Sequence, residues 1–202
     1  DNALEFADNA SAVFGAGSDL TITHDATDST ITSATNDLKI TSNGDDLILE
    51  AEDDVIIRDN AGSNILAQFI NGGANELYHN ATKKFETASG GVSLTGGAAA
   101  NVTALTDGST ITIDMATACH HSVTLAGNRT FAAPSNQVVG QAGSIFITQD
   151  GSGSRTAAFN AAFKFVGGTA PTLTTTAAAV DRIDYVILSS NVIHCAVSLD
   201  VK

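Results

Sequence analysis

Pairs of aliphatic residues two positions apart recur through the first part of the chain, and each pair follows a small or acidic dipeptide. We call each pair a rung; the rungs are Leu20/Ile22, Leu38/Ile40, Leu47/Leu49 and Val55/Ile57. A spacing of two is the side-chain period of a β-strand, so each rung predicts a very short strand with one apolar face. The repeat is imperfect, because the rung expected at Ser29 is polar and the nearest aliphatic residue there is Ile31.

A strand with only two inward-facing side chains cannot bury them by itself, so neighbouring rungs or neighbouring chains must cover its apolar edge. This requirement favours a β-prism or a triple-stranded β-helix, in which three identical chains wind about one axis. Asp, Asn and Gly residues between the rungs predict turns. No apolar stripe with helical spacing persists beyond one turn, so long helices are not expected. We therefore predict an elongated trimeric β shaft.

The acidic residues are concentrated in the first half of the 202-residue chain. Residues 1–100 hold 16 acidic and four basic residues, whereas residues 101–202 hold six acidic and five basic residues. A change of charge of this kind commonly accompanies a change of architecture. A Gly/Ala-rich stretch at residues 96–100 lies at the change. We predict a repetitive shaft over residues 1–96 and a globular head over residues 97–202.

The second half contains longer strand-like runs. They cover residues 111–113, 122–125, 145–148, 182–188 and 192–199. Turn dipeptides such as Gly127-Asn128 and Ser190-Asn191 separate them, and the glycine-rich residues 150–154 predict a hairpin turn. Strands at this spacing predict a compact antiparallel β-sandwich, jelly-roll-like in form, as the head. The whole chain is thus expected to be all-β.

Charge and hydropathy exclude two broad classes of function. The net charge of -13 excludes a net-basic nucleic-acid-binding protein, which needs clustered Lys and Arg. No apolar run approaches the roughly 18 residues of a membrane span, so membrane insertion is not expected. The chain starts at Asp1 without an initiator Met or a signal peptide, and we expect a further segment upstream.

Paired carboxylates in the first half, such as Asp45/Asp46 and Asp53/Asp54, raise the question of catalysis. Glycoside cleavage needs two carboxylates that face a sugar across a groove. These pairs instead recur with the rungs and have no aromatic neighbours, so we predict solvated turn residues; catalysis and calcium binding are the alternatives. The chain has no nucleophile, zinc-protease or phosphate-binding motif, and neither enzyme activity nor a cofactor is expected.

The adjacent residues Cys119, His120 and His121 are of the types that bind zinc. Neighbouring strand residues point to opposite faces, so the three cannot converge within one chain. We predict a polar strand end without a metal; a ring of one His from each of three chains is the alternative.

In the last predicted strand, Cys195 is two positions from both Ile193 and Val197, so the three side chains lie on the same face. This places Cys195 in the core as a small apolar group. Cys119 shares the parity of Val123 and Leu125 and is expected to be placed in the same way. Disulfides are rare in a reducing cytoplasm, so we expect two free thiols.

Residues 76–87 (Glu-Leu-Tyr-His-Asn-Ala-Thr-Lys-Lys-Phe-Glu-Thr) and 91–96 (Gly-Val-Ser-Leu-Thr-Gly) resemble a module common in the tail fibres of marine bacteriophages. The C-terminal half resembles the distal domain of phage tail-fibre and related virion proteins. The segments that carry this likeness are residues 127–130, 148–156, 163–165, 167–174 and 198–202. Similar domains often carry Trp where this chain has Phe163, at a sugar-stacking or core position.

The resemblance implies a homotrimeric virion fibre or spike, assembled in the cytoplasm of the bacterial host, that contacts the host surface. Its implied partners are other copies of the chain, other virion proteins through the upstream region, and a bacterial surface glycan or outer-membrane protein. The mechanism would be multivalent adhesion, in which three heads on one stem raise the effective concentration of weak contacts.

Loops vary on a fixed scaffold, so exposed head loops are the expected receptor contacts. The candidates are the segments around Asn128, Ser152 and Thr169. Three alternatives remain open: a purely structural head-decorating or connecting fibre, a polysaccharide-degrading tailspike, and a bacterial adhesin with a secretion signal or cell-wall anchor upstream.

Overall fold

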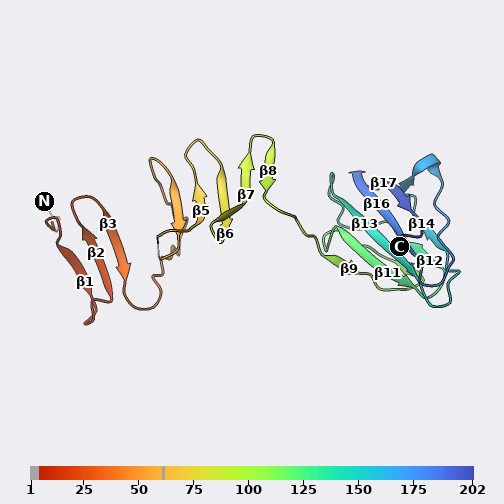
Figure 1. Ribbon diagram of the computed structural model, residues 1–202, viewed down its shortest axis with the longest axis horizontal. Coiled ribbons are helices and arrows are strands. Elements are labelled where there is room, and N and C mark those ends of the chain that lie inside the picture. The colour runs from red at the N-terminus through yellow and green to blue at the C-terminus, as the bar shows by residue number, and fades with distance from the viewer. Residues whose placement is uncertain (1–4, 61) are drawn as a thin grey trace. The chain divides into compact units, whose positions relative to one another are not determined.

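In the computed structural model, which describes residues 5–60 and 62–202, the chain is all-β (Figure 1). It divides into two compact units, Asp1–Thr95 and Gly96–Lys202, which we call unit 1 and unit 2. Over the described residues the single helical element is a 3-10 turn, η1 (Val166–Gly168), and no helix is long and apolar enough to cross a membrane.

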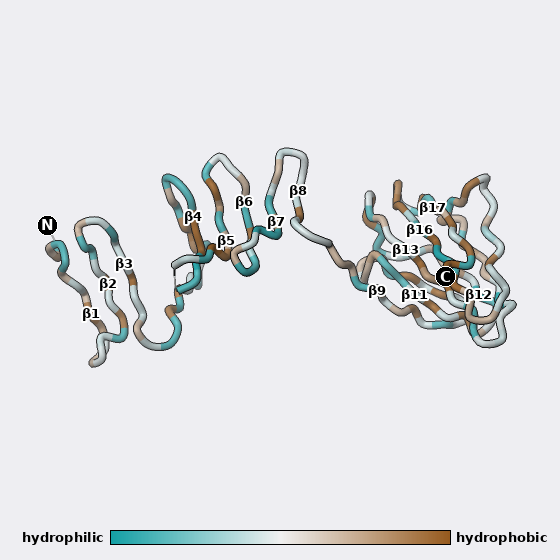
Figure 2. The backbone as a smooth tube through the Cα atoms, in the orientation of Figure 1, coloured by the Kyte–Doolittle hydropathy of each residue, from teal (hydrophilic) through white to brown (hydrophobic). Residues whose placement is uncertain are grey.

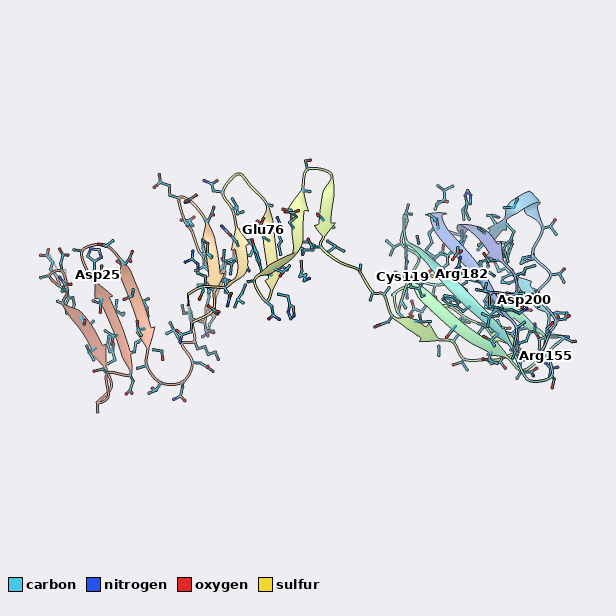
Figure 3. The ribbon with its side chains drawn as sticks, in the orientation of Figure 1. Asp25, Glu76, Cys119, Arg155, Arg182 and Asp200 are labelled. Carbon is cyan, nitrogen blue, oxygen red and sulfur yellow. The ribbon has the colours of Figure 1, made fainter. Side chains whose placement is uncertain are left out.

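Unit 1 begins with an antiparallel three-stranded sheet of β1 (Ser11–Phe14), β2 (Leu20–His24) and β3 (Ser29–Ser33). The strand register places three apolar side chains in one row across this sheet, namely Ala12, Ile22 and Ile31. The alternate positions are mostly Thr, so the opposite face is polar. The turn between β2 and β3 is held by Asp25 (Figure 3), whose Oδ1 accepts hydrogen bonds from the backbone N–H groups of Asp28 (2.7 Å) and Thr27 (3.0 Å).

A five-stranded antiparallel meander follows in unit 1. Its strands are β4 (Val55–Arg58), β5 (Ile65–Phe69), β6 (Asn75–His79), β7 (Thr82–Ala88) and β8 (Gly91–Leu94). One row of paired residues crosses all five strands and is entirely apolar: Ile57, Ala67, Leu77, Phe85 and Leu94. The neighbouring row on the other face is mostly polar: Ile56, Gln68, Glu76, Glu86 and Ser93. Figure 2 colours parts of β4 and β5 brown, the apolar end of its scale.

Two of the predicted rungs lie in strands and two do not. Leu20/Ile22 and Val55/Ile57 lie in β2 and β4, as predicted, and Ile31 lies in β3. Leu38/Ile40 and Leu47/Leu49 are not confirmed as strands within one chain, because residues 34–54 contain no strand and these four side chains are 46–69% exposed. Each of these rungs has two apolar side chains and no paired strand of the same chain beside it, so nothing within one chain stabilises the extended form.

Unit 2 consists of nine strands in two sheets. They are β9 (Val102–Ala104), β10 (Thr110–Ile111), β11 (His120–Leu125), β12 (Arg129–Phe131), β13 (Ala142–Gln149), β14 (Ala157–Phe159), β15 (Phe163–Phe165), β16 (Val180–Ser189) and β17 (Val192–Ser198). The six-stranded sheet has the order β15-β17-β16-β13-β11-β9, and the other sheet has the order β10-β12-β14. From β9 to β14 the chain alternates between the two sheets, and each strand pairs in parallel with the strand two places earlier.

The prediction of an antiparallel, jelly-roll-like sandwich as the head is confirmed in part: unit 2 has two sheets, but most of its strand pairs are parallel. Antiparallel pairing in unit 2 is confined to β13–β16–β17, and β9 to β14 form three coils of a parallel, solenoid-like arrangement. Residues 150–154 are correspondingly not a hairpin turn, because they carry the chain from β13 to β14 in the other sheet. Ser190-Asn191 does form the hairpin turn between β16 and β17, with Asn191 at a φ of 58°.

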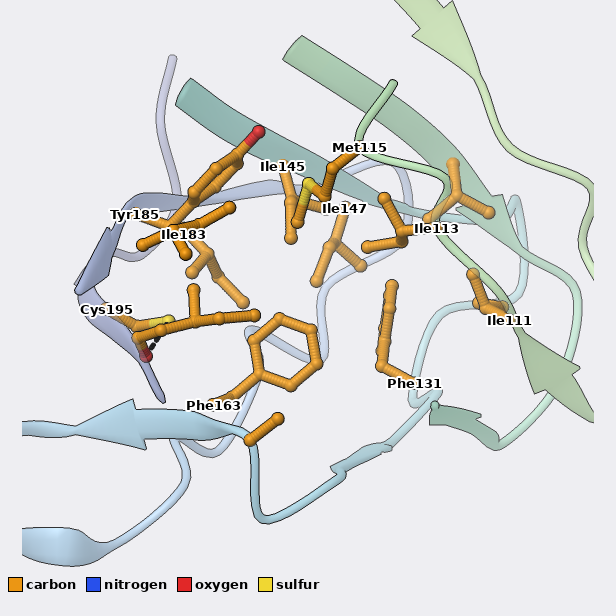
Figure 4. Close-up of a cluster of buried hydrophobic side chains, with 14 of the residues drawn as sticks. Ile111, Ile113, Met115, Phe131, Ile145, Ile147, Phe163, Ile183, Tyr185 and Cys195 are labelled. Carbon is orange, nitrogen blue, oxygen red and sulfur yellow. Dashed lines mark hydrogen bonds between the residues drawn. The ribbon is translucent and has the colours of Figure 1, made fainter. Parts of the chain in front are cut away.

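The core of unit 2 lies between its two sheets (Figure 4). Phe131 of β12 is fully buried and stacks on Phe159 of β14 with ring centroids 5.0 Å apart. Ile145, Ile147 and other aliphatic side chains of the six-stranded sheet pack against this aromatic pair. Phe163 is also buried, so its ring belongs to the core and is not available to stack on a ligand.

Candidate functional site

The turns that follow β9, β11 and β13 lie together, because those strands are parallel neighbours in one sheet. The structure brings two of the predicted contact residues to this turn cluster. Asn128, in the turn after β11, is exposed, and its Oδ1 accepts a hydrogen bond from the backbone N–H of Thr156 (3.0 Å). Ser152, in the turn after β13, is also exposed, and its backbone N–H donates to Oδ1 of Asp150 (3.0 Å).

Two ion pairs hold these turns in place. Arg129 forms a bidentate pair with Asp107, with Nε–Oδ1 at 2.7 Å and an Nη–Oδ2 distance of 2.5 Å. Arg155 pairs with Asp150 in the next turn, at an Nη–Oδ2 distance of 2.8 Å. Each guanidinium donates hydrogen bonds to the ionised carboxyl and so lowers the pKa of Asp107 and of Asp150. The two ion pairs thus connect the turns and neutralise their charges.

The pair between Asp107 and Arg129 makes a prediction about stability and pH. Because the pKa of Asp107 is lowered in the fold, its stabilising contribution is complete above the unfolded value of about 3.9 and is lost as pH falls through the lower, folded value. Asp107→Asn is expected to lower the thermal midpoint of unit 2 by a few degrees at pH 7, with the difference shrinking below pH 4. Calorimetry at pH 7 and pH 3 tests this, and Asp200→Asn, which removes only an exposed pair with Lys202, is the control.

The third predicted contact residue, Thr169, lies elsewhere, just after η1 at the β15 edge of the six-stranded sheet. Gly167 and Gly168 adopt φ values of 68° and 76°, a left-handed conformation that favours glycine. This turn leaves Val166 86% exposed. Thr169 and Val166 line a shallow depression of about 240 Å³ together with Pro171.

A larger depression, of about 610 Å³, lies on the outer face of the six-stranded sheet over β13, β15, β16 and β17. Its polar side chains are Lys164, His194 and Asp184. Its apolar side chains include Ala142, Val166, Val186 and Ala196. The sequence analysis missed this outer-face depression. The alternation of side chains along a strand does, however, place Lys164 and His194 on the face opposite the core, since each lies between two core residues of its strand.

Beside the depression, the strand register aligns His120, Ser144 and Asp184 in one row across β11, β13 and β16. Ser144 Oγ donates a hydrogen bond to Asp184 Oδ1 (2.7 Å), and Asp184 also pairs with Arg182 (3.0 Å; Figure 3). The hydroxyl proton is therefore directed at the carboxylate and not at the imidazole. A nucleophilic serine requires the opposite order, in which the histidine accepts that proton and the carboxylate orients the histidine.

The histidine and cysteine residues do not form a metal site within the part of the chain that the structure describes, where no group of three or more His, Cys, Asp or Glu side chains is arranged to hold an ion. His120 and His121 lie on opposite faces of β11, and His121 is fully buried, so His121 cannot contribute to a ring shared between chains. Cys119 and Cys195 are free thiols, as predicted. Cys195 lies in the core as predicted, and burial raises its pKa to about 11.

The paired aspartates of the first half, Asp45/Asp46 and Asp53/Asp54, lie outside strands. Asp45, Asp46 and Asp53 are exposed. Asp54 has a structural role, since its Oδ2 accepts a hydrogen bond from the side chain of Gln68 (2.7 Å) and its Oδ1 accepts one from the backbone of Asn71. These contacts place Asp54 at the start of β4, as a residue that holds the β4–β5 hairpin together.

His121 makes a prediction about acid stability. Neither of its ring nitrogens has a hydrogen-bond partner of normal geometry among the described residues. Burial lowers its pKa; the backbone of Ala118 and the carboxylate of Asp114 act in the opposite direction, and His120 lowers it further. The free energy of unfolding is therefore highest above the unfolded pKa of about 6.5, where His121 is neutral in both states. Below that pH it falls by up to about 1.4 kcal/mol per pH unit, because the unfolded chain binds the proton more readily. His121→Leu is expected to flatten this dependence. Guanidinium chloride unfolding at pH 7.5 and 5.5 measures it, and His194→Leu, at an exposed site, should keep the wild-type slope.

Three surfaces of the molecule are therefore candidates for a functional site: the apolar faces of the two sheets in unit 1, the turn cluster, and the outer-face depression of unit 2. Comparison of the chain with protein-family models, with curated proteins and with solved structures found no match.

Proposed function

We propose that the chain forms a homotrimeric virion fibre of the tail-fibre type, which attaches a bacteriophage to the surface of its host cell. Unit 1 would be the shaft and unit 2 the head. The observation that carries this proposal is the amphipathic character of both sheets of unit 1, whose apolar side chains stay largely exposed among the described residues. The likeness of residues 76–96 and of the C-terminal half to phage fibre segments supports the virion assignment.

Unit 1 has almost no core of its own. Among residues 5–60 and 62–95, Ala67 is the only buried side chain. In the apolar row of the meander, Ile57, Leu77 and Leu94 are each about half exposed. Contiguous apolar surface of this kind is typical of a protein interface, because exposure to water costs free energy that association recovers.

Two further copies of the same chain are the occupants that fit these faces. Three identical amphipathic sheets can close around a threefold axis with their apolar rows inward and their polar rows outward, as in a β-prism. The meander favours a prism over a triple-stranded β-helix for β4 to β8, because each chain already pairs its own strands. The rungs Leu38/Ile40 and Leu47/Leu49, which form no strand within one chain, would pair between chains.

The outward face of the meander is suited to solvent. Lys83 forms ion pairs with Glu76 (3.0 Å) and with Glu86, and Tyr78 donates a hydrogen bond to Glu76. These charges lie on the face opposite the apolar row. Charged outer faces discourage lateral pairing of β surfaces, which a long fibre must avoid.

In this assembly three copies of unit 2 would present their loops together. The exposed turns at Asn128 and Ser152 and the loop at Thr169 are the proposed contacts with a surface glycan or an outer-membrane protein. Avidity from three linked heads turns weak single contacts into stable attachment without any catalytic step.

Light scattering combined with size exclusion tests the assembly, and binding of labelled chain to a panel of marine Gram-negative bacteria tests the attachment. We expect a mass of three chains that persists through brief heating in detergent, and binding to a subset of strains. A monomer would contradict the fibre. A trimer that binds no strain would leave a connecting fibre, and shortening of the surface polysaccharide on incubation would indicate a tailspike.

A further inference from the structure

The basic residues of unit 2 are almost all paired. Four of its five basic residues form ion pairs with aspartates: Arg129 with Asp107, Arg155 with Asp150, Arg182 with Asp184, and Lys202 with Asp200. Within this fully described unit, Lys164 is the one base without a carboxylate partner. Its Nζ donates one hydrogen bond, to the backbone carbonyl of Ala161 (2.6 Å), and an ammonium group has three donors.

This unpaired cation lies in the outer-face depression. Lys164 of β15 is in register with His194 of β17, and His194 is in register with Val186 of β16. The two polar side chains therefore stand side by side on the exposed face of the sheet, with apolar surface next to them. Val166, held out by the Gly167-Gly168 turn, forms a wall of the same depression.

We propose that the outer-face depression binds an anionic group, a carboxylate or a phosphate, carried by a glycan of the host surface. Lys164 supplies the positive charge, His194 supplies a further hydrogen-bonding group, and Val166 and Val186 pack against the apolar faces of the sugar ring. This inference rests on the proposed attachment function and names the ligand class and the site.

Charge complementarity selects this occupant over a neutral one. An anion in the depression meets a cation whose charge is not already neutralised, because the adjacent Asp184 is paired with Arg182 at 3.0 Å. The chain as a whole carries a charge of -13 and repels anions, so attraction here is local and not a property of the surface at large. A second copy of the chain is the other possible occupant and is distinguished by the test.

The test uses the full chain on an array of uronic-acid, sialic-acid and phosphorylated oligosaccharides, each printed beside its carboxyl-reduced or dephosphorylated counterpart. We expect binding to charged members and at least tenfold weaker binding to their neutral counterparts; the carboxylate and phosphate arms identify the group. Lys164→Gln should weaken binding tenfold or more, whereas Lys164→Arg should retain it. Lys202→Gln removes a lysine that is already paired with Asp200 and should leave binding unchanged.

Equal binding to neutral counterparts, no binding to any charged member, or equal behaviour of Lys164→Gln and Lys202→Gln would each overturn this site. Loss of the trimer mass in Lys164→Gln would also overturn it, by assigning the depression to a contact between copies. Attachment is measured separately on the bacterial panel. A chain that attaches to cells regardless of Lys164 keeps the proposed function and loses this site, whereas a chain that attaches to no strain contradicts the attachment itself.

Discussion

Leu77→Asp is expected to convert the proposed trimer into single chains. Leu77 lies at the centre of the apolar row of the meander, where its partners in register are Ala67 and Phe85. It is 49% exposed in one chain, so a carboxylate there would stay hydrated and leave the isolated fold nearly unaffected. In the trimer the same carboxylate would be buried against apolar side chains three times over, at a cost of several kcal/mol per chain.

The native mass measured by light scattering should therefore fall from three chains to one, with the far-ultraviolet circular dichroism of a β protein retained. Ile56→Asp is the matched control, because Ile56 is also exposed but pairs with Gln68 on the opposite, polar face of the same sheet. That variant should remain a trimer. If Leu77→Asp also remains a trimer, or if both variants dissociate, the assignment of the apolar row to the trimer axis is wrong.

Phe131→Ala is expected to destabilise unit 2 by about 3–5 kcal/mol, a large part of the stability of a domain of this size. Phe131 is fully buried between the two sheets, stacks on Phe159, and comes from a strand of only three residues. Its removal leaves a cavity that the short strands β10, β12 and β14 have few other contacts to refill. The parallel sheet should loosen before the antiparallel part of the unit.

Native-state hydrogen exchange of the full chain, read on peptides from β12 and β13, measures this loss. Phe146→Ala is the matched control: Phe146 lies on the outer face of β13, is partly exposed, and should cost about 1 kcal/mol or less. If the amide protection of these peptides is the same in Phe131→Ala and Phe146→Ala, the two sheets do not share a single core.

The longer strands of unit 2 and several of the side chains that face its core could be predicted from the sequence, whereas the core placement of Cys119 was wrong, since that side chain is only partly buried. The runs around Ile145, Ile183 and Ile193 lie in β13, β16 and β17 as predicted, and the parity of Cys195 correctly placed it in the core. These features depend on local alternation, which the backbone geometry of a strand imposes wherever one face is buried. Of the candidate contacts, Asn128 and Ser152 are exposed turn residues because turn chemistry is equally local.

The direction of strand pairing could not be predicted in the same way. A strand of a two-sheet structure has one buried face whether its neighbour is parallel or antiparallel. The alternation of apolar and polar residues in β11 and β13 would therefore be the same for either direction of pairing. A glycine-rich turn such as residues 150–154 can reverse the chain within one sheet or carry it to another, and only the packing of the sheets distinguishes the two outcomes.

By itself, then, the sequence determined that this protein is all-β, where the longer strands of its second half lie, and that its first half has short strands with few apolar side chains to bury. The tertiary structure decided which strands are neighbours. It also decided that Lys164 and His194, 30 positions apart, stand side by side on an open sheet face. The physical reason is that alternation is a property of each strand, whereas pairing depends on the combined packing of strands from distant parts of the chain.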